Sequence, residues 1–283
     1  MKDLRVWVKV VLLFIALGVV GLICYFVVLP CINYFDAKEH MKAGEYKEAL
    51  VEFESLDGFL NSEKKAEECG IAICGEEGWN EIKNLKVGDI YQFGSYEQDN
   101  DLSNGKEAIE WQILDKKGTQ ILVISEYVLD CQPYDWGGLD ITWEDSSLRE
   151  WLNLHFIADA FSEEEQAMIP IVTVSADKNP EYNVQTDPGN PTEDQIFVLS
   201  GQEAARYFAS DDDRIGVATP YASAQGIQNH TQNGHCWTWL RNPGIQQDCA
   251  ANVGSNGHIY YIGEYVQRYT DGVRPAMWID LHP

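Results

Sequence analysis

Cysteine and histidine side chains, which are common metal ligands, gather in the last third of the chain. Zinc sites need such residues at short, characteristic spacings. The candidates are His230, His235, Cys236, Cys249 and His258. They contain no C-x-x-C pair, and twelve residues separate the two cysteines, so the spacing matches no zinc signature. We therefore expect no metal at these residues.

Cys236 is the residue most similar to a catalytic nucleophile, because Trp237 follows it directly, as in papain-type proteases. A thiol nucleophile needs a histidine base. Papain-type enzymes place that histidine far downstream, whereas here only His258 and His282 follow. We therefore expect no catalysis. A disulfide between Cys236 and Cys249 stays open as an alternative to two free thiols.

Carboxylates are the third group that could do chemistry. Asp211–Asp213 and the segment Asp177–Asp194 offer oxygen ligands for calcium. Neither segment has EF-hand spacing, and the lectin-type triplets Glu-Pro-Asn and Gln-Pro-Asp are missing from the sequence. We expect no cofactor, and calcium is the alternative left open. The formal net charge of −25 would repel nucleic-acid phosphates, so no nucleic-acid partner is expected.

Residues 242–271 are rich in Tyr, Asn, Ser and Gly. This composition is typical of adaptable binding surfaces, in which tyrosine provides contact area and small polar residues provide hydrogen bonds. We predict a ligand-binding face at Trp237, Asn242, Asp248, Asn252, Asn256, His258, Tyr260, Tyr261 and Tyr265. Arg241 and Arg274 lie in apolar strings, where an unpaired guanidinium is costly. We interpret both as structural arginines that bond carbonyls or a carboxylate.

Short strands and helices must position these residues. Alternating or apolar runs predict strands at 89–93, 109–114 and 120–124, with a hairpin turn at Lys117-Gly118. Helix starts are indicated at Ser146 and by the capping boxes Ser162–Glu165 and Ser200–Glu203. Helices and strands mix without a βαβ rhythm, which favours an α+β fold.

A membrane anchor is predicted near the start of the sequence. Residues 10–29 contain no charged side chain, and twenty residues at 1.5 Å each span a bilayer core of about 30 Å. Lys2, Arg5 and Lys9 precede this run, which places residues 1–9 in the cytoplasm. We expect a single-pass protein of the cell membrane, with 10–30 as the transmembrane helix and the C-terminal domain outside.

Residues 31–80 are predicted to form a helical spacer, with a turn at Gly44 and a further helix from Ser62. Gly44, Tyr46, Ala49 and Phe53 follow a G-x-Y-x-x-A-x-x-x-F arrangement. The segment thereby resembles a single tetratricopeptide-like helical hairpin. One repeat cannot bury a continuous core by itself, which favours a spacer that lifts the following domain off the membrane.

Residues 84–283 resemble a bacterial family known as domain of unknown function 6273. The matching strings are Val87–Tyr96, Ile109–Leu114, Ser125–Cys131, Thr142–Asn153, Trp237–Gly244 and Gly272–Leu281. Thr238 and Asn242 depart from the family's usual W-W-L-R-S-P-G. The ending W-L-R…G-V-R-P-A is similar to C-type-lectin-like folds. The resemblance therefore implies a lectin-like mixed domain with short strands and two to three helices.

These observations together predict a membrane-anchored bacterial surface protein that binds an unidentified ligand, a glycan or a protein, and contacts the lipid bilayer through residues 10–29. Two alternatives stay open. One is a structural component of an envelope complex that acts through the helical hairpin. The other is an uncharacterised hydrolytic or formylglycine-generating-like enzyme.

Overall fold

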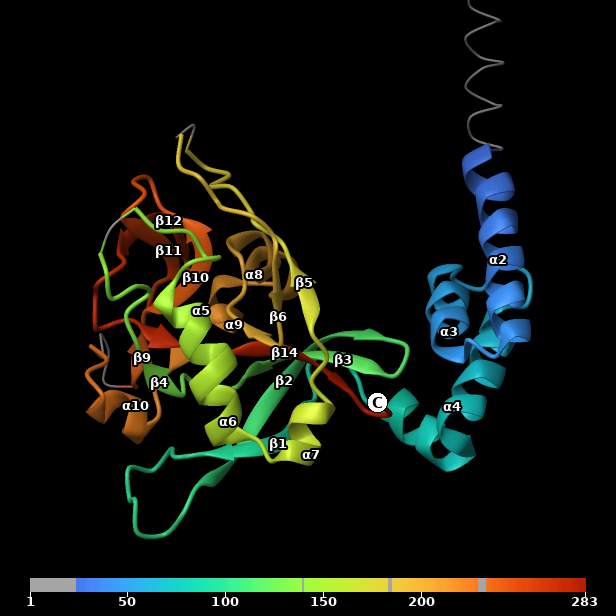
Figure 1. The fold of residues 1–283 in the computed structure, drawn as a ribbon, viewed down its shortest axis with the longest axis horizontal. Helices are drawn as coiled ribbons and strands as arrows, with labels where there is room; N and C mark the ends of the chain where they lie inside the picture. The colour runs from blue at the N-terminus through green and yellow to red at the C-terminus, as the bar shows by residue number, and fades with distance from the viewer. Residues whose placement is uncertain (1–23, 139, 183–184, 229–232) are drawn as a thin grey trace, which may run out of the picture. The chain divides into compact units, whose positions relative to one another are not determined.

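The computed structural model describes residues 24–138, 140–182, 185–228 and 233–283. The chain divides into two compact units (Figure 1). The first contains the residues up to Asn84 together with Lys117–Thr119, and the second contains Leu85–Lys116 and Gln120–Pro283. Most of the predicted membrane segment 10–29 lies outside the described residues, as does His230. Among the residues that are described, no helix is long and apolar enough to cross a membrane.

The first unit is helical and contains η1 (Cys24–Val28), α2 (Leu29–Ala43), α3 (Tyr46–Ser55) and α4 (Ser62–Asn84). Gly44 ends α2 in the left-handed region, with φ of 84°, and its amide bonds the Met41 carbonyl. Gly75 bends α4 with φ of 76°. Ala49, Leu50 and Phe53 are spaced to form one apolar stripe on α3, and all three are buried.

The first sheet of the second unit has the strand order β1-β2-β3-β14-β7. Its strands are β1 (Ile90–Tyr96), β2 (Glu107–Lys117), β3 (Gln120–Ser125), β14 (Ala276–Asp280) and β7 (Ile196–Phe197). β14 pairs antiparallel with both β3 and β7, and Figure 1 shows it alongside β3. Ile121, Val123, Met277 and Ile279 are fully buried in this sheet.

The second sheet has the order β12-β11-β10-β13-β4. Its strands are β12 (Ile259–Tyr265), β11 (Cys249–Val253), β10 (Thr238–Pro243), β13 (Gly272–Val273) and β4 (Asp130–Cys131). Every residue of β10 and β11 is buried, whereas β12 lies at the edge. Two short pairs complete the strands: β5 (Val172–Val174) with β6 (Thr192–Asp194), and β8 (Gly216–Val217) with β9 (His235–Cys236).

Short helices connect the strands: α5 (Ser147–Trp151), η2 (Leu152–Phe156), α6 (Ile157–Ala160), α7 (Glu163–Ala167), α8 (Gly201–Tyr207), α9 (Asp211–Arg214) and α10 (Pro220–Ala224). The Ser146 side chain caps α5, and both predicted capping boxes form, at Ser162 and Ser200. A third capping box, at Ser210, was not predicted. The second unit is therefore a mixed α+β domain, as expected.

Residues 177–194 are rich in Pro, Asn, Asp and Gly, which predicts an exposed loop, and most of the described residues there form one, but the end of the segment does not. Its end forms β6, and Asp194 is buried. Arg149 donates to Asp194 over 2.6 Å from Nε, and Trp143 donates over 3.0 Å from Nε1. These partners lie more than forty residues away in sequence, so the local composition gave no sign of the burial.

Candidate ligand-binding surface

Trp237 and Tyr260 stack on each other at one end of the strands β10, β11 and β12 of the second sheet. Trp237 lies between β9 and β10, and Tyr260 lies in β12. Their ring centroids are 5.1 Å apart and the ring planes differ by 16°. His258 meets the Tyr260 ring edge-on, with centroids 4.9 Å apart. We call Trp237, Tyr260, His258 and Asn256 the aromatic shelf; the sequence predicted all four as binding residues.

The turn before β12 holds the polar part of the aromatic shelf. Asn256 donates from Nδ2 to the Tyr260 hydroxyl over 3.3 Å, and its Oδ1 accepts from the His258 amide over 3.2 Å. A Cβ on Gly254 would lie 2.5 Å from the Tyr260 ring, so this position needs glycine. Asn256 and His258 are exposed, which leaves them accessible to a ligand.

Helix α9 supplies an acidic rim to the aromatic shelf. The His258 Nδ1 and an Asp211 carboxylate oxygen lie 3.6 Å apart, and both side chains are about half exposed. Arg214 fixes the turn to α9, because its Nε donates to the Gly257 carbonyl over 3.0 Å. A surface pair such as His258 and Asp211 contributes little to stability. Asp211 also forms an ion pair with Arg214, so its carboxylate faces both His258 and the arginine that bonds the turn.

Gly257 provides a test of how this turn is positioned. It has φ of +78°, and a Cβ there would lie 1.7 Å from the Asp211 carbonyl oxygen. Gly88 has φ of +92° with open space around it. We expect Gly88→Ala to cost about 1 kcal/mol for the left-handed backbone alone. Gly257→Ala should cost about 2 kcal/mol because overpacking is added. Urea unfolding measures both, and equal losses would contradict the close approach to α9.

Asn242 and Asn252 do not lie on a surface, in contrast to the binding face predicted for them. Asn242 is fully buried, donates to the carbonyls of Asp177 and Lys178, and accepts from the Gly201 amide. Asn252 is fully buried and donates to Asp271 over 3.1 Å. Both strands that carry them are covered on two sides, so their polar side chains bond inside the protein.

The other predicted binding residues lie apart from the aromatic shelf. Tyr261 follows Tyr260 in β12 and packs against Gly201, where a Cβ would lie 2.3 Å from its hydroxyl. Tyr265 is exposed at the end of β12. Asp248 is half-buried, and its Oδ1 accepts from the Cys249 thiol over 3.6 Å. The structure therefore gathers four of the nine predicted residues into one surface.

Arg241 and Arg274 are both buried and both bond backbone carbonyls. Arg241 donates to the carbonyls of Ser175 and Val198 and forms a two-pronged ion pair with Glu203. Arg274 donates from Nε to the Ser125 carbonyl over 2.7 Å and lies over the Phe208 ring. Burial lowers the pKa of Arg274 to about 10. These contacts are those of arginines that connect segments of the fold.

Cys236 does not have the surroundings of a nucleophile. It is buried, its thiol donates to the Gly216 carbonyl, and burial raises its pKa to about 12. A reactive cysteine has a lowered pKa and some exposure. Within the described ranges, Cys236 and Cys249 are free thiols.

Three carboxylates elsewhere in the described residues lie close enough together to hold a metal ion. They are Glu97, Asp99 and Glu107.

Sequence reasoning missed a second exposed aromatic pair. Trp136 is 57% exposed and Tyr269 is 53% exposed, and their rings meet at 5.0 Å with 70° between planes. An exposed tryptophan in a Gly-rich segment, Asp135-Trp136-Gly137-Gly138, was the available signal. Trp136 stands far from the 242–271 region in sequence, so composition alone did not connect the two.

Comparison with known proteins gave one match. No curated protein and no solved structure matched the chain. The sequence profile described as "Domain of unknown function (DUF6273)" matches residues 118–281, which is more than half of the chain and contains the entire aromatic shelf. The protein therefore belongs to the DUF6273 family.

Proposed function

We propose that this protein is a membrane-anchored surface protein that binds an envelope glycan outside the cytoplasm, through the aromatic shelf of a C-type-lectin-like domain and without catalysis. The observation that carries the proposal is the shelf itself. Stacked Trp237 and Tyr260 are ringed by exposed polar groups of His258, Asn256 and Asp211. The lectin-like assignment is supported by the topology. The chain leaves the first sheet after β7, forms β10 to β13 of the second sheet, and returns to the first sheet at β14.

A glycan fits this surface better than other ligands. Aromatic rings offer apolar faces to the C–H groups of a sugar, while neighbouring amides, imidazoles and carboxylates bond its hydroxyls. The net charge of −25 disfavours anionic partners such as nucleic acid. A neutral or amino sugar is therefore the class of ligand that the aromatic shelf and the acidic rim together favour.

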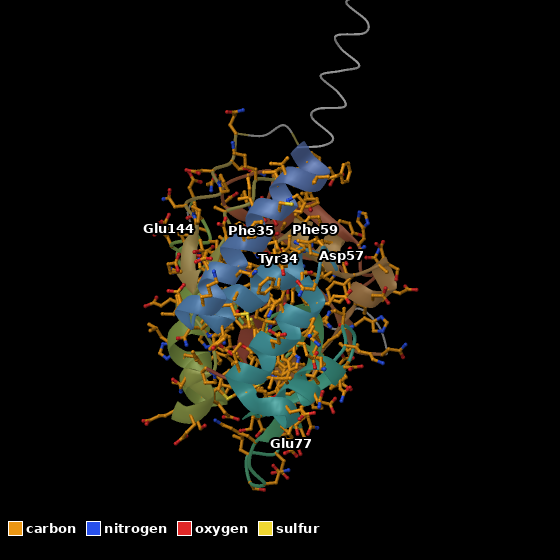
Figure 2. All side chains as sticks on the ribbon, turned by 90° about the vertical axis from the view of Figure 1, so that its right-hand side faces the viewer. Tyr34, Phe35, Asp57, Phe59, Glu77 and Glu144 are labelled. Atoms are coloured by element: carbon orange, nitrogen blue, oxygen red, sulfur yellow. The ribbon has the colours of Figure 1, made fainter. Side chains whose placement is uncertain are left out.

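The membrane location is supported by the first unit. Tyr25 and Phe26, near the end of the apolar run, are more than 60% exposed, and Phe35, which follows the run, is 59% exposed. Together with Leu56 and Phe59 they give this end of the unit an apolar surface; an open groove of about 700 Å³ lies there. Figure 2 shows Phe35 and Phe59 in the part of the unit nearer the start of α2, with Glu77 farther away. Tyr side chains, such as that of Tyr25, are enriched at membrane interfaces.

Binding to a glycan array tests the proposal. Tyr260→Ala removes the ring that connects Trp237 and His258, so we expect at least about tenfold weaker binding of the glycan that the wild type selects. Tyr265→Ala is the matched control, because it removes an exposed tyrosine of the same strand outside the aromatic shelf. Equal affinity for the wild type and the Tyr260 variant, or an equal loss in both variants, would reject the aromatic shelf as the binding site.

A further inference from the structure

A long hairpin loop joins β1 to β2, and three carboxylates converge at its neck. Glu97 follows the last residue of β1, and Glu107 is the first residue of β2, where it pairs with Tyr96. One oxygen each from Glu97, Asp99 and Glu107 lies within 4.8 Å of the other two. This convergence places like charges together, which costs free energy unless a cation or a proton compensates it.

Glu97 has an unusual environment for a carboxylate in a loop. It is only 7% exposed, and its Oε1 has no hydrogen-bond partner among the residues that the structure describes. The backbone amides of Asn100 and Asp101 bond the same carboxylate. Loss of water, and next the charge of Glu107, raise the pKa of Glu97. A buried carboxylate oxygen normally has a partner, so Oε1 indicates a ligand that the protein alone does not supply.

Hydrogen bonds inside the loop hold the other two carboxylates in place. Asp99 accepts from the Asp101 amide over 2.8 Å and from the Asn104 side chain over 2.8 Å. Glu107 uses Oε2 to accept from the Gln98 amide over 2.7 Å. The three carboxylates are thus preorganised by the loop before any ion binds, which reduces the entropy lost on binding.

The basic residue of this loop does not neutralise the three carboxylates. Lys106 is the one Lys or Arg in the sequence from 97 to 107. Its Nζ donates to the Asp159 side chain over 2.5 Å and to the Asp159 carbonyl over 2.6 Å. Lys106 therefore pairs with Asp159 of α6. The negative charge of the three carboxylates at the neck of the hairpin can then be compensated by a bound cation.

We propose that Glu97, Asp99 and Glu107 bind a calcium ion. Carboxylate oxygens are the ligands that Ca²⁺ prefers, and oxygens in a shell of 2.3–2.6 Å radius lie at most about 5 Å apart. Ca²⁺ also accepts irregular loop geometry and fills its shell with water and backbone carbonyls, whereas Mg²⁺ demands a near-ideal octahedron. Zn²⁺ favours nitrogen and sulfur ligands, which these three side chains lack. The site differs from Asp211–Asp213 and the segment 177–194, the acidic stretches that the composition indicated.

Melting of the purified full chain in detergent, after removal of metals with a chelator, tests this proposal. With millimolar Ca²⁺ the wild type should melt about 3 °C higher, since ligand binding to the folded state raises the melting temperature. Glu97→Gln should abolish this shift. Asp212→Asn, which removes one exposed acidic charge from α9, is the matched control and should keep the shift.

The chelated samples separate loss of the site from misfolding. Without metal, Glu97→Gln should melt at or above the wild type, because the variant removes an uncompensated buried charge. In Ca²⁺ the order should reverse. A variant that misfolds would melt lower in both conditions and could not give this reversal. The proposal is overturned if the wild type shows no Ca²⁺ shift, if Glu97→Gln keeps the full shift, or if Mg²⁺ at the same concentration reproduces the shift.

Discussion

Glu203→Ala is expected to destabilise the second unit by about 3 kcal/mol, because it leaves a buried guanidinium without its main partner. The Arg241 side chain is 1% exposed, and its Nη2 lies 2.8 Å from Glu203 Oε1. A second contact joins Nη1 to Oε2. Asp177, at 3.6 Å, retains part of the ionic interaction, so the expected loss lies at the lower end for a broken buried pair.

Asp213→Ala is the matched control for this prediction. Glu203 and Asp213 each occupy the N3 position of a capping box, at Ser200 and Ser210, but Asp213 is exposed. Loss of a capping interaction alone should cost about 1 kcal/mol. Urea unfolding followed by tryptophan fluorescence reports on the second unit, which contains seven of the nine tryptophans. If the two variants lose the same free energy, the Arg241–Glu203 ion pair contributes no more stability than a capping interaction.

Asp271 should make the stability of the second unit depend on pH. It is buried, and loss of water raises its pKa to about 6, against an ordinary value of about 4. The folded state therefore binds a proton more tightly than the unfolded state does. The stabilisation is fully present below about pH 4 and is lost as the pH rises through 6. Two pKa units at 1.36 kcal/mol each correspond to about 3 kcal/mol.

Asp271→Asn should remove this dependence. At pH 7 the variant should be more stable than the wild type by up to about 3 kcal/mol, since it carries no buried charge, and the difference should vanish near pH 4. Urea unfolding at pH 4, 5, 6 and 7 measures it. Asp212→Asn, an exposed acid, should follow the wild-type curve. Parallel curves for the wild type and the Asp271 variant would show that this carboxyl does not titrate between pH 4 and 7.

Local sequence signals predicted those parts of the fold that local interactions determine. The capping boxes at Ser162 and Ser200 and the turn at Gly118 need only neighbouring residues, and all three form. The box at Ser210 was hidden within Asp211–Asp213, because three consecutive acids resemble a solvated loop or a cation site.

Contacts between residues far apart in sequence determined which polar residues are buried, and the sequence did not predict these contacts. Asn242 and Asn252 have the composition of a binding surface, yet their hydrogen-bond partners come from residues 177, 201 and 271. A polar residue in a strand covered on both faces cannot be distinguished from a surface residue without knowing the sheet. Asn256, His258 and Tyr260 could be grouped from the sequence because they are neighbours, whereas the stacking of Trp237 on Tyr260 depends on the fold.

The placement of β14 has a consequence for how the chain is made. Residues 276–280 form an inner strand, between β3 and β7, so the first sheet cannot be completed until this segment has been synthesised. Until then, the edges of β3 and β7 have unpaired backbone groups, which is the condition under which nascent chains pair wrongly or aggregate. The inner strand β14 is thus the last strand of this domain to be synthesised. A frameshift or stop codon shortly before residue 276 would remove β14 and separate β7 from β3.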